Sequence, residues 1–246
     1  MKPSLKNPKL NVERAKEHLE VLDTALVKIQ DLKPFRVTHY ENPEHTHYVI
    51  SSQIPIIDLR LAILAGDAIY SLRSALDHIA WQLALTTKDR PFDRTEFPIV
   101  GEDTSENMRR FKRVTQDIPV SAVNEIKALQ PYQRGTAYKD DLLWKLDKLC
   151  NIDKHRVIPA QGTAIDFKLP KSLKSSDCVF GTLDDAHIVA VPIAFKAEMQ
   201  LAPPPTPDIL LGSEVDELVV SIRELAKIYK YVRDSVIPRF ACFFTE

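Results

Sequence analysis

One long stretch, residues 56–85, constrains this chain more than any other part of its sequence. It reads IIDLRLAILAGDAIYSLRSALDHIAWQLAL, and its apolar residues recur at the three- and four-residue spacing of an α-helix. The stretch predicts a helix of about seven or eight turns, and its one glycine, Gly66, indicates close packing or a bend. Because apolar side chains point in nearly every direction around this helix, we expect surplus apolar surface and therefore a homodimer.

Other segments share the helical period of apolar residues: residues 11–32, 121–129, 140–153 and 213–240. Asn11 is expected to cap the first of these helices. Ser213 is expected to open the last one, with Asp216 three residues later in a near match to a capping box, and Pro238 is expected to close it.

Two kinds of segment predict β structure. Residues 35–40 and 47–54 are β-branched and aromatic, and Asn42-Pro43-Glu44 between them supplies a turn, so they predict a hairpin. After His155 the apolar period is nearer two, which is typical of a small antiparallel sheet. We therefore expect an α+β fold, a helix-dominated bundle with an N-terminal hairpin and a small antiparallel sheet before the last helix.

The expected organisation is one domain over residues 1–246. Residues 56–160 form its helical core, 161–202 a β insertion and 213–240 the C-terminal helix.

Composition excludes several classes of protein. With 33 Lys and Arg against 34 Asp and Glu, the chain is no wholesale electrostatic binder. It has only 6 glycines and contains neither GxGxxG nor GxxxxGK[ST], which disfavours folds built on phosphate loops. Its 3 cysteines form no CxxC pair. No leader-like apolar segment and no run of about 18 apolar residues occurs, so we expect a cytoplasmic protein without a membrane span.

A line of polar side chains follows one face of the long predicted helix, at steps of four, three and four residues: Asp67, Ser71, Ser74 and His78. Buried polar groups need partners, because each one left unpaired costs about 1–3 kcal/mol. Arg73 and Asp77 lie four residues apart on an adjoining face and are expected to pair. One interpretation is structural: these residues bridge neighbouring elements of the bundle.

A second polar cluster ends the predicted helix over residues 140–153. Its members are Asn151, Asp153, Lys154, His155 and Arg156. Lys and His there also suit the negative end of a helix dipole. We expect this cluster to be a spatial neighbour of His78, since each would supply partners that the other lacks. A metal held by His78 and His155 is an alternative.

Basic residues surround Phe111 between Arg109 and Arg113. They are candidates for contacts with RNA phosphate, with Phe111 against a base. A solvated face is the alternative.

Several motifs in roughly the first 160 residues resemble those of a group of uncharacterised bacterial and phage proteins: RAKEHLE, GDAIYSLRSALDHIAWQL, FPI, LQPY and LLWKLDKLCNIDKHR. That group has no established activity, so this resemblance implies no function.

The spacing Arg73-x4-His78 is similar to the helical motif of HEPN domains, many of which are metal-independent ribonucleases. The resemblance implies that Arg73 binds the scissile phosphate and that His78 moves a proton to or from the RNA 2′-hydroxyl or the leaving oxygen. These roles suit a permanently charged guanidinium and an imidazole that titrates near neutral pH. In that family the composite site forms across a homodimer.

The leading hypothesis is therefore a HEPN-like ribonuclease or nucleic-acid-processing effector that needs no cofactor and acts on RNA. Its candidate catalytic residues are Arg73, His78, Asp77 and His155. Its candidate substrate-binding residues are Ser74, Asn151, Asp153, Lys154 and Arg156. The alternatives are a non-catalytic binding or assembly module and a metal-dependent enzyme that uses His78 and His155.

Overall fold

The stretch that dominates the sequence forms helix α2 (Leu59–Ala84) in the computed structural model of this protein. The α2 side chains of Ile69, Leu72 and Leu76 are entirely buried. Gly66 is buried as well, because the carboxyl group of Asp153 packs against its backbone. Of the two expectations for Gly66, close packing is therefore the one that the structure confirms.

The structure describes residues 2–31, 36–53, 58–155, 157–158, 160–163, 167–168, 173–183, 186–201, 208–213 and 218–244. The chain divides into two compact units. Unit 1 comprises Met1–Leu22, Leu59–Pro159 and Leu211–Glu246, and unit 2 comprises Asp23–Asp58 and Ala160–Leu210. Each unit is thus assembled from segments that are far apart in the sequence.

The remaining α-helices are α1 (Lys6–Asp31), α3 (Ser105–Val114), α4 (Val120–Ala128), α5 (Leu142–His155) and α6 (Ile222–Tyr231). Segments of 3-10 helix cover Pro131–Asp140, Ser175–Asp177, Ile193–Glu198 and Ile237–Phe243, and a π-helical turn covers Val232–Val236. Helices α4 and α5 confirm two of the helices expected from sequence. None of the helices in the described ranges combines the length and the apolarity that crossing a membrane requires.

The strands are β1 (Arg36–Glu41), β2 (His47–Gln53), β3 (Ala160–Thr163), β4 (Phe167–Lys168), β5 (Val179–Leu183), β6 (Ala186–Pro192), β7 (Gln200–Leu201), β8 (Asp208–Ser213) and β9 (Leu218–Ser221). They form sheets of order β1-β2-β6-β5, β3-β8-β9 and β4-β7. The expected α+β, helix-dominated fold is confirmed.

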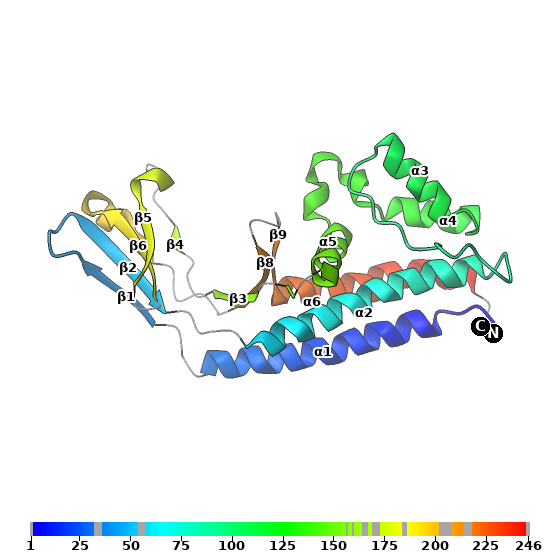
Figure 1. Cartoon of the computed structure of the whole chain (residues 1–246), viewed down its shortest axis with the longest axis horizontal. Helices are drawn as coiled ribbons and strands as arrows, with labels where there is room; N and C mark the ends of the chain where they lie inside the picture. Colours follow the sequence, from blue (N-terminus) through cyan, green and yellow to red (C-terminus); the bar gives the residue numbers. More distant parts are fainter. Residues whose placement is uncertain are drawn as a thin grey trace. The chain divides into compact units, whose positions relative to one another are not determined.

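Helices α1 and α2 run antiparallel, side by side (Figure 1). Two hydrogen bonds fix this alignment, one from the Ser4 backbone N–H to Gln82 Oε1 and one between Asn11 Nδ2 and His78 Nδ1. Helix α1 begins at Lys6 rather than at the predicted cap Asn11. Pro8 lies in its first turn, where a missing N–H breaks no helical hydrogen bond, so the proline does not stop the helix.

The last helix also begins later than predicted. Ser213 ends strand β8, and α6 starts after Ser221, whose Oγ accepts a hydrogen bond from the backbone N–H of Glu224. The runs DILLGS and LVVS are extended because they are short and rich in branched apolar residues. The predicted partner in the capping box, Asp216, lies outside the described residues. Pro238 does not close the helical region, which continues in 3-10 form to Phe243.

Unit 2 contains the four-stranded antiparallel sheet. The predicted hairpin is confirmed, with Tyr40 opposite Val49 in β1 and β2. Strand β2 then pairs with β6, with Ile50 opposite Val189. This second pairing, which no sequence pattern predicted, joins the hairpin to strands from the β insertion.

Candidate functional site

Arg73 is buried in unit 1, where the residue is 7% exposed. Its Nη1 donates to Asp77 Oδ1 (2.6 Å), its Nε to Asp147 Oδ1 (3.2 Å) and its Nη2 to the backbone oxygen of Phe97 (3.0 Å). The predicted pairing of Arg73 with Asp77 is confirmed. Burial alone would disfavour the charged form, but the Asp77 and Asp147 carboxylates outweigh it and raise the pKa of Arg73. Arg73 therefore joins α2 to α5 and to the loop that contains Phe97.

Asp77 accepts two hydrogen bonds on one carboxylate oxygen. Besides Arg73, the backbone N–H of Phe97 donates to Asp77 Oδ1 (3.0 Å). Burial raises the pKa of the Asp77 carboxyl in spite of these contacts. Within the part of the chain that the structure describes, Asp77 Oδ2 has no hydrogen-bond partner, which leaves an acid–base group with one free oxygen.

His78 points toward α1, not toward the surroundings of Arg73. It is exposed, and its Nδ1 lies 2.9 Å from Asn11 Nδ2. Five residues rotate a helix by about 140°, so Arg73 contacts α5 and the Phe97 loop while His78 contacts α1. The structure does not bring these two side chains to a common partner.

The polar cluster at the end of α5 lies beside the first half of α2. Asp153 packs on Gly66, and Arg73 contacts Asp147, so α2 and α5 run antiparallel. Gly66 precedes His78 by about 18 Å of helix at roughly 1.5 Å per residue. The expected proximity of His78 to this cluster is therefore wrong: the cluster lies near Gly66, and His78 lies further along α2.

The other members of that cluster are placed as follows. Asn151 Nδ2 donates to Asp147 Oδ2 (3.1 Å). Burial, and then the nearby charge of Asp67, raise the pKa of Asp153. Lys154 and His155 are exposed in the last turn of α5, while Arg156 lies outside the described residues. Ser74 is half-buried on α2.

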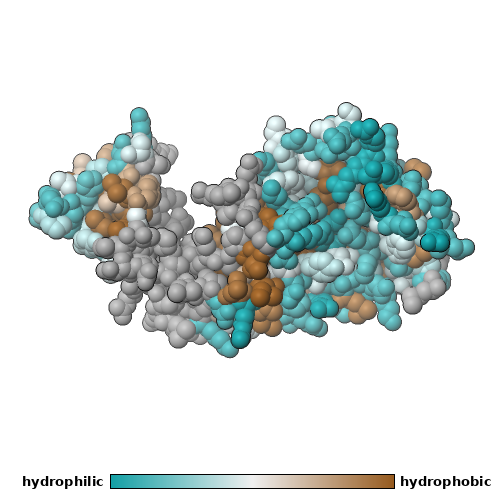
Figure 2. Space-filling model, viewed as in Figure 1, coloured by the Kyte–Doolittle hydropathy of each residue, from teal (hydrophilic) through white to brown (hydrophobic). Residues whose placement is uncertain are grey.

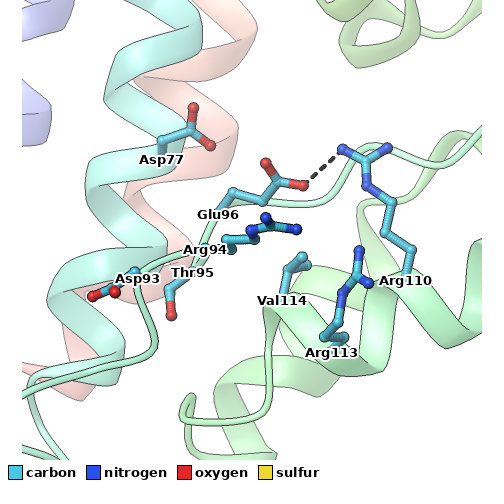
Figure 3. A pocket seen from close by; sticks show the side chains of 8 residues that line it. All are labelled: Asp77, Asp93, Arg94, Thr95, Glu96, Arg110, Arg113 and Val114. Atoms are coloured by element: carbon cyan, nitrogen blue, oxygen red, sulfur yellow. Dashed lines mark hydrogen bonds and ion pairs between the residues drawn. The ribbon is translucent and has the colours of Figure 1, made fainter.

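Asp77 also lines a pocket of about 460 Å³ between α2, the loop before Phe97 and α3 (Figure 3). The lining residues are Asp77, Asp93, Arg94, Thr95, Glu96, Arg110, Arg113 and Val114. We call this cavity the arginine pocket. Three guanidinium groups from two separate segments thus share one open cavity with three carboxylates.

The charges in the arginine pocket do not cancel pairwise. Glu96 Oε1 accepts a hydrogen bond from Arg110 Nη2 (2.7 Å), as Figure 3 shows, and Asp77 is held by Arg73. Neither Arg94 nor Arg113 has a carboxylate partner among the residues that the structure describes. The lining as a whole carries three cations and three carboxylates, and Arg94 and Arg113 are its two cations without an ion pair in the described residues, which leaves them available to an anionic ligand.

Buried contacts hold the walls of the pocket in place. The loop is pinned at Phe97, which is buried and bonded through its N–H to Asp77 and through its oxygen to Arg73. Gln130 adds bonds to the backbone of Val100 and Pro98. These contacts explain the apolar FPI interruption that the sequence shows in an otherwise polar loop.

Helix α3 forms the opposite wall. Thr104 caps it, accepting a hydrogen bond from the backbone N–H of Asn107. Phe111 is 1% exposed, so the expected contact of Phe111 with an RNA base is wrong: this ring anchors the helix in the core. The basic residues around it were identified from sequence, but Arg94 and Glu96 were not.

The arrangement offers no metal centre in the described ranges, where no three or more His, Cys, Asp or Glu side chains are grouped to hold an ion. His78 and His155, the pair considered for a metal, are not brought together. Comparison with family models, with curated proteins and with solved structures finds no match for this chain.

Proposed function

We propose that this protein binds a phosphate-bearing ligand in the arginine pocket, with Arg94 and Arg113 as the phosphate ligands. The observation that carries the proposal is that both guanidinium groups line one pocket without a carboxylate partner in the described residues. Arg110 is committed to Glu96, which holds it at the rim. Guanidinium groups bind phosphate through parallel N–H donors, and two of them match a doubly charged phosphate.

This proposal reassigns the phosphate-binding role that the HEPN resemblance gives to Arg73. All three nitrogens of that guanidinium donate to protein acceptors, so its hydrogen-bonding capacity toward a ligand is largely used. Asp77 connects the two sites, since it holds Arg73 and lines the pocket. Cleavage of RNA stays a prediction, and Asp77 is the acid–base group that the pocket offers for it.

The test is calorimetric titration of the protein with inorganic pyrophosphate at low ionic strength. The decisive variant is the double substitution Arg94→Gln/Arg113→Gln. A charge-assisted hydrogen bond contributes about 1.5 kcal/mol or more, and about 1.4 kcal/mol is tenfold in affinity. The double variant is therefore expected to bind pyrophosphate at least about tenfold more weakly.

The matched control is Lys9→Gln/Arg14→Gln, which removes the same charge from exposed positions on α1. It is expected to leave pyrophosphate binding unchanged. Equal affinities of the wild type and the pocket variant would contradict the proposal. So would an equal loss in the control, since that would indicate a response to net charge alone.

A further inference from the structure

The last two turns of α3 carry four cations: Arg109, Arg110, Lys112 and Arg113. At about 100° per residue, they occupy one continuous arc of the helix surface, opposite the buried Phe111. Arg110 and Arg113 form the side of this arc that lines the arginine pocket. Arg109 and Lys112 form the other side, and both are exposed.

This arc extends the unpaired cations of the pocket outward over the helix surface. Neither Arg109 nor Lys112 has a carboxylate partner within the described part of the chain. Figure 2 shows hydrophilic residues gathered over α3 on this face of the molecule. Glu106, in the first turn of α3, lies on the same arc and opposes an anion there. The attractive path therefore leads from the pocket around the last two turns of the helix, away from Glu106.

We infer that the ligand of the arginine pocket is a single-stranded nucleic acid, one phosphate of which enters the pocket while the following phosphates run along Arg109 and Lys112. The inference rests on the proposed function and names its ligand class. A small phosphate ester would occupy the pocket alone and leave those two cations unused. A polyanion with a flexible backbone can contact the pocket cations and these two outer cations at the same time.

The same surface predicts binding that does not depend on the base sequence of the strand. Phe111 is the one aromatic residue of α3, and it is buried. Phe97, at the end of the pocket loop, is also buried. Neither of these two rings can stack on a base, so we expect binding to come from the phosphates.

Salt dependence gives the expected size of the effect. For single strands, log K falls against log salt concentration with a slope of about −0.7 per neutralised phosphate. One phosphate in the pocket and one each on Arg109 and Lys112 make three neutralised phosphates, which predict a slope of about −2. Removing the outer two cations leaves one phosphate and predicts a slope of about −0.7.

The experiment measures fluorescence anisotropy of labelled oligouridylates of one, four, eight and twelve nucleotides across a series of KCl concentrations. The wild type is expected to bind the twelve-nucleotide strand at least about tenfold more tightly than the mononucleotide. Oligoadenylate and oligothymidylate of the same length are expected to bind within a few-fold of oligouridylate.

The separating variant is Arg109→Gln/Lys112→Gln. It is expected to keep the wild-type affinity for pyrophosphate, to lose the gain with strand length, and to show the smaller salt slope. Pyrophosphate binding without any gain from strand length would overturn this inference and leave the proposed function standing. No pyrophosphate binding by the wild type would overturn the proposed function. Preference for a duplex of equal length, or for one base, would overturn the single-stranded, base-independent ligand.

Discussion

Replacing Arg73 by Met removes the guanidinium that joins α2, α5 and the Phe97 loop while keeping most of the side-chain volume. The change leaves Asp77 with one donor, the backbone N–H of Phe97. The Phe97 oxygen loses its Arg73 donor, and Asp147 keeps only its bond from Asn151. We expect a large loss of stability, because these acceptors then face a partly apolar environment.

The magnitude follows from how buried each partner is. Breaking a buried ion pair by removing one member costs about 3–5 kcal/mol. The Arg73 side chain is 9% exposed, but the Asp77 and Asp147 side chains are 38% and 31% exposed, so water can partly replace the lost contacts. We therefore take the lower end of that energy range: Arg73→Met should lower the free energy of unfolding by about 3 kcal/mol.

Urea denaturation followed by tryptophan fluorescence measures this loss, since Trp81 and Trp144 both lie in unit 1. With a slope of about 2–3 kcal/mol per molar urea, the midpoint should fall by about 1–1.5 M. A second substitution, Asp77→Asn, should cost less in the Arg73→Met background than alone, by about 1 kcal/mol or more, because the residues are coupled. A loss below about 1 kcal/mol for Arg73→Met, or strict additivity, would refute the buried network as a source of stability.

Three further outcomes are expected. Gly66→Ala should have a more favourable effect on the free energy of unfolding in an Asp153→Ala background than in the wild type, since the new Cβ would lie 2.6 Å from Asp153 Oδ1. In the Asp153→Ala background the better helix propensity of alanine should add about 0.5–1 kcal/mol of stability, measured by thermal melting. Lys88 lowers the pKa of Asp117 from its ordinary 3.8, so this contact stabilises the fold above that pH and is lost as the pH falls through the lower pKa of the folded state. Urea titrations should therefore show Asp117→Asn less stable than the wild type at pH 7, with the difference in unfolding free energy shrinking in acid. A difference that stays constant with pH would contradict this. Cleavage of single-stranded RNA in EDTA to 2′,3′-cyclic phosphate ends stays a prediction; because Asp77 lines the pocket and His78 contacts α1, Asp77→Asn is expected to slow it about 10²–10⁴-fold and His78→Ala to leave it unchanged, and a gel assay with the opposite result would restore His78 as the acid–base group.

The elements best predicted from sequence are those whose local pattern and packing agree. Helix α2 is apolar on most sides and buried on most sides, so its period alone located it. The hairpin was equally clear, because its turn at Asn42 uses the side chain to bind the backbone of Thr46 and His47. The helix boundaries failed where two local signals competed. Ser213 and Ser221 both offer a cap, and strand β9 (Leu218–Ser221), visible in the structure, decides for Ser221.

The candidate site was predicted in part. The pairing of Arg73 and Asp77 depends only on helical spacing, and it holds. The arginine pocket depends on where a loop crosses α2. No periodic pattern in the sequence predicts that Arg94 and Arg113 line the same pocket. The apolar FPI segment was the available signal: three residues of that kind in a polar loop indicate an anchored backbone. An anchored loop next to a basic helix could have indicated a pocket between them.

Unit 1 combines segments from the beginning, middle and end of the chain, which are synthesised at different times. Leu5, just before α1, and Val12 of α1 share a groove with Tyr229 and Ile237, which lie more than two hundred residues later in the chain. At about 5–20 residues synthesised per second, α1 leaves the ribosome roughly 10–40 s before its partners exist. During that interval its apolar face has no native cover from them. The apolar face of α1 therefore gains its full native cover in unit 1 only when nearly the whole chain has been synthesised.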